Sequence, residues 1–429
     1  MKRRLAIVEI FRHREPALLV SGQTVSNFGD GVATVALSLL VIDTTHSVSK
    51  LAWFAAARMI PLVALLLIGG AIVDRVSRRV LLIVSDVGRG VLTGLLAAAI
   101  VAHVLTFTEM LVFAVAFGAF DALFAPAISA ITPDIVPEDL LPAMNAVRPL
   151  SSNLVGNMIG PAVGGILAAW STSAAIGLDC LTFVVSAASL ALMRPTPKPV
   201  RESTASMLAD IREGLGYVRR TTWIWTTLAA VTLVNALVLT PMFVLVPYFL
   251  RHNLHVSKPL FGYAFVVMGA TGALGAVVAG NLKMPRRRIR VIWTYWTISC
   301  AAAFIFAAAT NYWEVLIFPI VASPCITLGN VIWETMMQAE VPRELLGRVS
   351  SVDWFVSLGL SPIGLVVAGS LSSAIGIHTY FVVMASVCIV PGLAILASKS
   401  ANAVDRDRVS PGAGEGPSTG APAPIESPS

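Results

Sequence analysis

The chain has 429 residues, of which 56% are hydrophobic and 13% are charged, and its mean hydropathy is +0.80. Because globular domains usually carry roughly 25% charged residues, this composition excludes a set of water-soluble domains and indicates a chain built from membrane spans. The formal charge of +6 does not indicate nucleic-acid binding, since the arginines are spread over short connections rather than gathered on one surface.

Apolar stretches long enough to cross a bilayer, about 20 residues each, follow one another along the chain. We predict twelve transmembrane helices, at residues 15–42, 50–73, 79–102, 107–130, 141–169, 173–194, 221–249, 259–282, 289–310, 312–338, 345–373 and 376–398. A longer polar connection follows the sixth span and contains an amphipathic helix from Met207 to Arg220. From Ser400 the chain is rich in Pro, Gly, Ser and Ala, which predicts a disordered tail.

An internal repeat divides the spans into two sets of six. The sequence Val136-Pro-Glu-Asp-Leu-Leu141 after the fourth span recurs as Val341-Pro-Arg-Glu-Leu-Leu346 after the tenth. Two six-span halves with parallel repeats are a known transporter plan. We therefore predict an all-α membrane protein of two pseudo-symmetric halves. The units are an N-terminal half (1–194), a cytoplasmic linker (195–220), a C-terminal half (221–398) and a disordered cytoplasmic tail (399–429).

The basic residues predict the orientation of the chain in the membrane. If the amino terminus is inside, most of the 30 Lys and Arg residues lie in cytoplasmic connections, and only Lys50, Arg251 and Lys258 lie outside. This asymmetry follows the positive-inside rule. We expect a multi-pass protein of the plasma or inner membrane with both termini in the cytoplasm.

The sequence shows no pattern for metal binding or enzymatic chemistry. The four cysteines are scattered through apolar stretches, and the six histidines lie near span ends. Neither H-E-x-x-H nor G-x-x-x-x-G-K-[ST] occurs, so hydrolytic chemistry and direct use of ATP have no visible apparatus. We expect no enzyme activity, no metal, no cofactor and no nucleic-acid partner.

The connection between the second and third spans combines one acid with several arginines. Asp74 could accept hydrogen bonds from the amino end of another helix, and the arginines could pair with acids such as Asp86. Such contacts would break when the two halves rock apart, which predicts a cytoplasmic latch; an ordinary positive-inside loop is the alternative. The predicted latch comprises Gly70, Asp74, Arg75, Arg78, Arg79, Asp86, Arg89 and Asp353.

Glycines recur at every fourth position in the fifth predicted span, at Gly156, Gly160 and Gly164, with Pro161 and Gly165 between and after them. On a helix these glycines line one face and leave a groove without side chains. Pro161 removes a backbone donor in the middle of this groove. We predict that the groove lies where two parts of the protein press together, as a seal between the halves.

These two segments resemble motifs of a known family. Residues 70–79 resemble the G-x-x-x-D-R-x-G-R-R motif of the major facilitator superfamily, with Ser77 in place of the second glycine. Residues 156–165 match the G-x-x-x-G-P-x-x-G-G motif of its drug–proton antiporters, and the resemblance covers residues 15–398. With Gln23, Gly29, Asp30, Arg58, Pro126 and the repeated Val-Pro-x-x-Leu-Leu, the chain looks most like the branch of macrolide-efflux and enterobactin-exporter proteins.

The resemblance implies an inward–outward rocking cycle, with the fifth helix packed near the eighth. It also implies export of a small molecule in exchange for protons. The fourth span lacks the arginine that many proton-coupled relatives carry there, so the usual assignment of the coupling residue cannot be transferred to this chain.

Candidate coupling residues follow from the cost of an ionisable group inside a span, which marks a functional site by default. Asp30 lies near the middle of the first span and could bind and release protons. Arg58 on the second span could be its partner, and a permanent structural Asp30–Arg58 pair is the alternative. Asp121 on the fourth span is a further candidate, for proton binding, helix packing or a polar cavity. Asp179 lies nearer the outer end of the sixth span and could reach water.

Aromatic side chains inside the spans could line an adaptable apolar cavity. The candidates are Phe28, Phe120, Phe124, Phe243, Trp333 and Trp354. The predicted function is secondary active efflux of a small hydrophobic or amphipathic compound, coupled to protons, by a monomer in the bilayer. Uptake or facilitated permeation is the alternative within this class, and a non-transporting sensor or scaffold is the alternative outside it.

Overall fold

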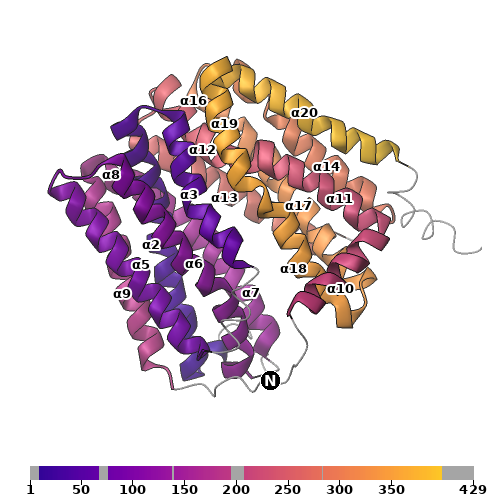
Figure 1. Cartoon of the computed structure of the whole chain (residues 1–429), viewed down its shortest axis with the longest axis horizontal. Helices are drawn as coiled ribbons and strands as arrows, with labels where there is room; N and C mark the ends of the chain where they lie inside the picture. Colours follow the sequence, from indigo (N-terminus) through magenta and orange to yellow (C-terminus); the bar gives the residue numbers. More distant parts are fainter. Residues whose placement is uncertain (1–8, 67–75, 138–139, 195–206, 283, 399–429) are drawn as a thin grey trace, which may run out of the picture.

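The computed structural model describes residues 9–66, 76–137, 140–194, 207–282 and 284–398. Every regular element in these ranges is a helix, as the composition predicts. Figure 1 shows two groups of helices side by side, one from the first part of the chain and one from the second. The boundaries of the two predicted halves remain a prediction.

The N-terminal group contains six helical segments. Within the described residues, five of these segments are single helices, and the fifth segment in chain order has three parts. Their bounds are α2 (Arg14–Thr45), α3 (Val48–Leu66), α5 (Arg78–Val101), α6 (Phe107–Ile135), α7 (Leu141–Ser151) continued by the π-helical η2 (Ser152–Ile159) and α8 (Gly160–Trp170), and α9 (Thr172–Leu192).

The C-terminal group also contains six segments, and α10 (Met207–Arg220) precedes them in the range predicted for an amphipathic helix. Their bounds are α11 (Thr222–Val234) with η3 (Asn235–Leu239), α12 (Thr240–Tyr248) and η4 (Phe249–Asn253); α13 (Lys258–Asn281); α14 (Arg288–Ala302) with α15 (Ile305–Ala308); α16 (Tyr312–Val315) with α17 (Ile317–Glu340); α18 (Arg343–Gly359) with α19 (Ser361–Ile375); and α20 (Ile377–Ala397).

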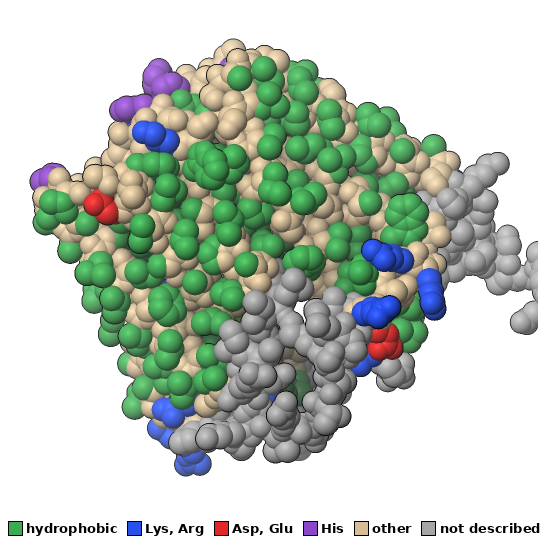
Figure 2. All heavy atoms as spheres, viewed as in Figure 1, with side chains coloured by type: hydrophobic (Ala, Val, Ile, Leu, Met, Phe, Trp, Pro, Cys, Tyr) green, Lys and Arg blue, Asp and Glu red, His purple; other side chains and the backbone are tan. Residues whose placement is uncertain are grey.

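Eleven helices within the described ranges are long and apolar enough to cross a membrane. The segment from α7 to α8 is not among them by these criteria, but it occupies the place of the fifth predicted span and packs against α2, α9 and α13. Figure 2 shows hydrophobic side chains over most of one face, with most of the visible Lys and Arg toward the lower part of the view. An apolar outer face of this kind fits contact with lipid.

Prolines account for the irregular turns in two of the spans. Pro161 lies in the first turn of α8, directly after the π-helical η2, and Pro241 lies in the first turn of α12, directly after η3. A proline inside a helix lacks the N–H donor, and its ring clashes with the carbonyl four residues earlier. A wider π turn before the proline accommodates both effects and bends the helix.

The buried apolar side chains show how the two groups meet. One large cluster draws on both groups, for example through Leu39 and Phe183 from the first and Phe249 and Phe381 from the second. Two smaller clusters each belong to one group alone. The groups therefore share a core at one end, here called the joined end, which includes the turns at Thr45–Val48 and Asn253–Lys258. At the opposite end, here called the separated end, each group has its own core.

Candidate functional site

A buried cluster of charges lies among the N-terminal helices, with Arg89 of α5 at its centre. The Arg89 guanidinium is 2.5 Å from Asp86 on its own helix, 3.3 Å from Asp121 of α6 and 3.9 Å from Asp30 of α2. The side chain of Arg89 is 3% exposed, and that of Asp86 is 0% exposed. Three carboxyl groups from three helices thus converge on one guanidinium group.

Aromatic rings hold the Arg89 guanidinium in place. Its Cζ atom lies 4.5 Å from the ring centre of Phe124 and 4.5 Å from that of Phe183. A cation over an aromatic face is attracted by the electrons of the ring. Phe124 therefore contacts the charge cluster; it was predicted to line a substrate cavity.

Asp121 joins a second arginine to this cluster. The Arg58 guanidinium lies 3.2 Å from Asp121 Oδ2 and stacks over Phe117, with 4.6 Å between Cζ and the ring centre. The prediction that Arg58 pairs with Asp30 is therefore wrong: Asp121 is the partner of Arg58, and Asp30 faces Arg89. The cause is helix rotation, which depth along a span does not reveal.

A chain of hydrogen bonds fixes the buried carboxylate of Asp86. Ser186 Oγ of α9 donates to Asp86 Oδ2 at 2.6 Å, and Gln23 Nε2 of α2 donates to Ser186 Oγ at 3.0 Å. Buried carboxylates need such donors because they have lost their water. The chain joins α2, α5 and α9 around the charge cluster.

Asp86 and Arg89 were predicted to belong to a cytoplasmic latch, and the structure corrects this. Arg89 lies half-way along α5, about three turns from Arg78 at its start. Both residues are part of the buried charge cluster, so the position of Asp86 near one end of the span was a poor guide to its partners.

Asp179 of α9 is a further buried acid, and the prediction that it reaches water is wrong. Its side chain is fully buried, Thr182 Oγ1 donates to it at 3.3 Å, and its second oxygen has no partner among the described residues. Gly29 of α2 lies against it, since a Cβ atom at Gly29 would be 2.5 Å from Asp179 Oδ1. A side chain at position 29 would therefore push α2 away from α9.

Part of the predicted latch lies outside the described residues, namely Gly70, Asp74 and Arg75. Arg78 pairs with Asp134 and donates to the carbonyl of Ala130 at 3.0 Å. Arg79 donates to the carbonyls of Leu190 and Ala191 at 2.8 and 2.5 Å. These bonds join α5 to α6 and α9 within the N-terminal group, so a latch between the two groups remains a prediction.

The glycine groove of the fifth span lies between the two groups of helices. A Cβ atom at Gly160 would be 2.7 Å from the Phe28 carbonyl oxygen of α2, and one at Gly164 would be 2.6 Å from that of Val32. A Cβ atom at Gly165 would be 2.6 Å from the Lys258 carbonyl oxygen of α13. One edge of the groove thus packs on α2 and the other on α13.

The same region explains the neighbouring motif residues. A Cβ atom at Gly156 would be 3.2 Å from the Asn27 carbonyl oxygen, and Pro161 faces both groups, since its ring lies against Gly31 and its carbonyl against Gly262. Phe28 is half-buried in the shared core beside this contact. The packing of the fifth helix against the eighth, expected from the resemblance, is present; a sealing role remains a prediction.

Ion pairs that were not predicted from the sequence close the joined end. Asp43, at the end of α2, lies 3.1 Å from Arg251 Nε and 3.0 Å from Lys258 Nζ. Lys258 Nζ also lies 3.4 Å from the Ala168 carbonyl oxygen. The sequence held a signal for these ion pairs, because Arg251 and Lys258 are two of the three basic residues assigned to the outer side.

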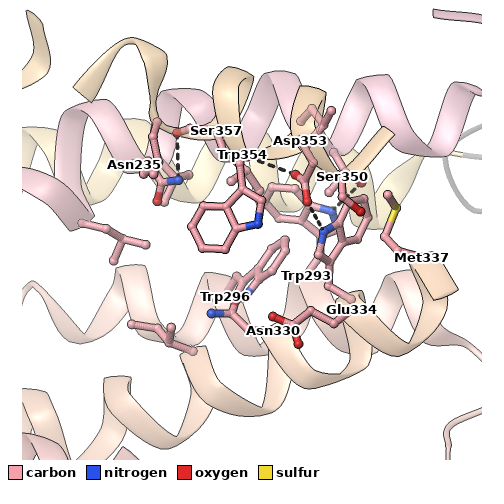
Figure 3. Close-up of a pocket in the computed structure, with 18 of the residues that line it drawn as sticks. Asn235, Trp293, Trp296, Asn330, Glu334, Met337, Ser350, Asp353, Trp354 and Ser357 are labelled. Atoms are coloured by element: carbon pink, nitrogen blue, oxygen red, sulfur yellow. Dashed lines mark hydrogen bonds between the residues drawn. The ribbon is translucent and has the colours of Figure 1, made fainter. Parts of the chain in front are cut away.

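A cavity of about 380 Å³ opens among the C-terminal helices α11, η3, α14, α17 and α18 (Figure 3). Four tryptophans line it, and two of them, Trp333 and Trp354, were predicted to line a cavity. Phe120 packs instead against Gly88 of α5. Phe243 is 62% exposed on α12. Phe28, Phe120, Phe124 and Phe243 are not among the residues that line this cavity.

Asp353 also lines this cavity, and neither of its hydrogen-bond donors belongs to the predicted latch, so its place in the latch stays a prediction. Trp333 Nε1 donates to Asp353 Oδ2 at 3.1 Å, and Ser357 Oγ donates to Oδ1 at 3.2 Å. Asp353 lies near the middle of α18, one turn before Ser357, and its carboxylate accepts from Trp333 of the neighbouring α17.

Comparison with known proteins agrees with this architecture. The sequence matches the family described as Major Facilitator Superfamily over residues 19–352 and again over residues 228–426. It is 30% identical to the multidrug efflux pump Tap of Mycolicibacterium fortuitum over 399 residues, which are 86% of this chain and 92% of the relative. It is 24% identical to macrolide efflux protein A of Streptococcus pyogenes over 391 residues, 86% and 92% of the two chains.

A solved structure shares the fold. The inward-facing, unoccupied bacterial homolog of the human lysosomal transporter Spinster superimposes with a TM-score of 0.69 at 14% identity, over 93% of this chain and 99% of that one. At this identity the likeness shows the arrangement of helices.

Proposed function

Because this chain belongs to the Major Facilitator Superfamily, we propose that it is a proton-coupled exporter of small hydrophobic or amphipathic compounds that works by alternating access. The names of its relatives, a multidrug efflux pump and a macrolide efflux protein, support export of drug-like compounds. The family resemblance and the apolar outer face support a place in the cell membrane, where we propose a monomer.

The shared and separate cores support alternating access. The two groups of helices are joined at the end that holds Asp43, Arg251 and Lys258, and each has its own core at the opposite end. If the amino terminus lies in the cytoplasm, as the basic residues indicate, the joined end faces outward. The structure then represents a state that is closed outside and opens toward the cytoplasm.

The charge count in the buried cluster is the observation that carries the proposed proton coupling. Among the described residues, Asp30, Asp86 and Asp121 form ion pairs with Arg58 and Arg89 alone, so the three carboxyl groups of these pairs share two positive charges; the fully buried Asp179 makes no ion pair. A net charge is costly inside a membrane protein. Binding one proton balances the cluster, and its release during the cycle would couple the proton gradient to the movement of the helices.

Asp30 is the carboxyl group best placed to exchange this proton. It is 3.9 Å from Arg89, farther than either other acid, and its side chain is 31% exposed. Asp86 is fully buried and tightly bound, and Asp121 bridges two arginines. Asp30 therefore combines the loosest pairing with a side chain that is only partly buried.

Inside-out vesicles test this proposal. Acridine orange fluorescence follows a pH gradient established across the vesicle membrane. Addition of an exported compound, such as chloramphenicol, erythromycin or tetraphenylphosphonium, should dissipate this gradient only in vesicles that contain the protein. The variant Asp30→Asn should lose this proton movement but retain exchange of labelled compound across the membrane without a gradient. Glu9→Gln, a half-buried acid outside the predicted spans that pairs with Arg12, is the matched control.

Three results would contradict the proposal. Movement of compounds in the opposite direction would identify an uptake system. Proton movement by Asp30→Asn equal to that of Glu9→Gln would remove Asp30 from the coupling. Failure of a broad panel of compounds to move in either direction would reject transport of drug-like compounds.

A further inference from the structure

The cavity in the C-terminal helices has a composition of its own, distinct from the buried charge cluster. Its four tryptophans come from three helices: α14 contributes Trp293 and Trp296, α17 contributes Trp333, and α18 contributes Trp354. Its volume of about 380 Å³ falls in the range of pockets for small molecules. The cavity is therefore large enough for a compound with one or more aromatic rings.

The charge of the lining has one sign only. Glu334 and Asp353 contribute carboxyl groups, and no Lys, Arg or His is among the described residues that line the cavity. Asp353 is engaged by Trp333 and Ser357. Glu334 has no hydrogen-bond or ion-pair partner within the described part of the chain, and its side chain is exposed to the cavity. Glu334 therefore supplies the carboxyl group of this site that no described side chain engages.

The rings are arranged so that aromatic faces remain available. Trp293 and Trp296 meet edge to face, with 5.3 Å between ring centres, and Trp223 and Trp333 do so at 5.6 Å. The Trp354 side chain is 61% exposed, although Figure 3 shows it directed into the cavity together with Trp296. Tryptophan faces attract cations more strongly than other side-chain rings do. Tryptophan faces and a carboxyl group that no described side chain engages line the same cavity, which suits a ligand that is both aromatic and positively charged.

We propose that this cavity binds lipophilic organic cations that carry aromatic rings. Glu334 supplies the counter-charge, and Trp296 and Trp354 supply the faces against which the ligand stacks. Asp353 is a positioning residue, because its bond to Trp333 Nε1 fixes the ring of Trp333 in the wall. The inference rests on the proposed export function in that it names one class of compound that the exporter takes.

Binding of tritiated tetraphenylphosphonium to the purified full-length protein tests this assignment without requiring transport. Glu334→Gln keeps the size of the side chain and removes its charge, and should weaken binding roughly tenfold or more. Trp354→Ala should weaken it by a similar factor. Glu340→Gln is the matched control, since it removes the same charge from the same helix but lies outside the cavity, paired with Arg288 at 3.3 Å.

A neutral probe separates charge recognition from general disruption. Binding of labelled chloramphenicol should change less than twofold in Glu334→Gln, whereas equal loss for both probes would show a damaged site and overturn the role of the charge. Binding of tetraphenylphosphonium by Glu334→Gln as tight as by Glu340→Gln would also overturn it. Export of neutral compounds by a protein that binds no cation would refute this inference while leaving the proposed function intact.

Discussion

Substitution of Gly165 by alanine tests whether the glycine groove sets the balance between the joined and opened arrangements. The added Cβ atom would lie 2.6 Å from the Lys258 carbonyl oxygen and 3.1 Å from Gly262 Cα, both on α13. The first distance is shorter than a carbon–oxygen contact permits, and its partner is backbone, which cannot rotate away as a side chain does. The two groups of helices must therefore move apart at the joined end.

The size of the effect follows from the cost of overpacking, which is typically about 1–3 kcal/mol. The clash exists only where α8 and α13 are in contact. It therefore destabilises the joined arrangement and not one in which the two helices are apart. A difference of about 1–3 kcal/mol changes the ratio of two states by roughly 5- to 150-fold. The variant should therefore shift the protein measurably toward opening at the joined end.

Gly177→Ala is the matched control. Gly177 lies in α9 of the same group, and a Cβ atom there would have no neighbouring atom within 4 Å. Both substitutions replace glycine by alanine inside a helix, which removes about the same conformational-entropy cost in each. Any difference between the variants therefore reports the contact with α13.

Distances between spin labels measure the shift. In a protein whose four cysteines are replaced, labels at His103→Cys and Asn253→Cys place one probe on each group of helices near the joined end. Gly165→Ala should add a population with a longer distance, and Gly177→Ala should not. Identical distance distributions for the two variants would refute the reasoning.

Two further predictions concern the ion pairs and the buried carboxylate. Asp43→Asn removes the partner of Arg251 and Lys258. Since all three side chains are about a third exposed or less, each pair should contribute up to about 1 kcal/mol. The same pair of spin labels should show a partial shift toward the longer distance, and high salt should reproduce this shift in the unsubstituted protein but not in the variant. Ser186→Ala removes the donor to Asp86 Oδ2 and leaves Gln23 without its acceptor. The free energy of unfolding, measured by thermal unfolding in detergent, should therefore fall by about 1–3 kcal/mol. An unchanged midpoint would show that water replaces the hydroxyl group.

Local patterns were sufficient to predict the elements of the fold. The period and length of apolar stretches placed a helical segment at each of the twelve predicted spans, because a bilayer requires a minimum apolar length and internal satisfaction of every backbone group. The glycines at Gly156, Gly160 and Gly164 predicted close helix contact, since their spacing puts them on one helix face whatever the surroundings. Pro161 marked the point where that helix becomes irregular.

Partners of side chains were much harder to predict. Asp30 and Arg58 have similar depths in their spans, yet Arg58 turns to Asp121 and Asp30 faces Arg89. Asp86 was assigned to a surface latch because it lies near one end of its span, but it is fully buried. Depth follows from sequence position, whereas the direction of a side chain depends on the rotation of each helix against its neighbours.

The sequence by itself determined the class of the protein, its division into spans and the family to which it belongs, because these depend on composition and on motifs read along one chain. Only the tertiary structure decided that Arg89 gathers three acids, that Asp43 closes the joined end across two groups of helices, and that Glu334 shares a cavity with four tryptophans. These sites combine residues as far apart in the chain as Asp43 and Lys258, which come together through packing angles and helix rotations that the local sequence does not encode.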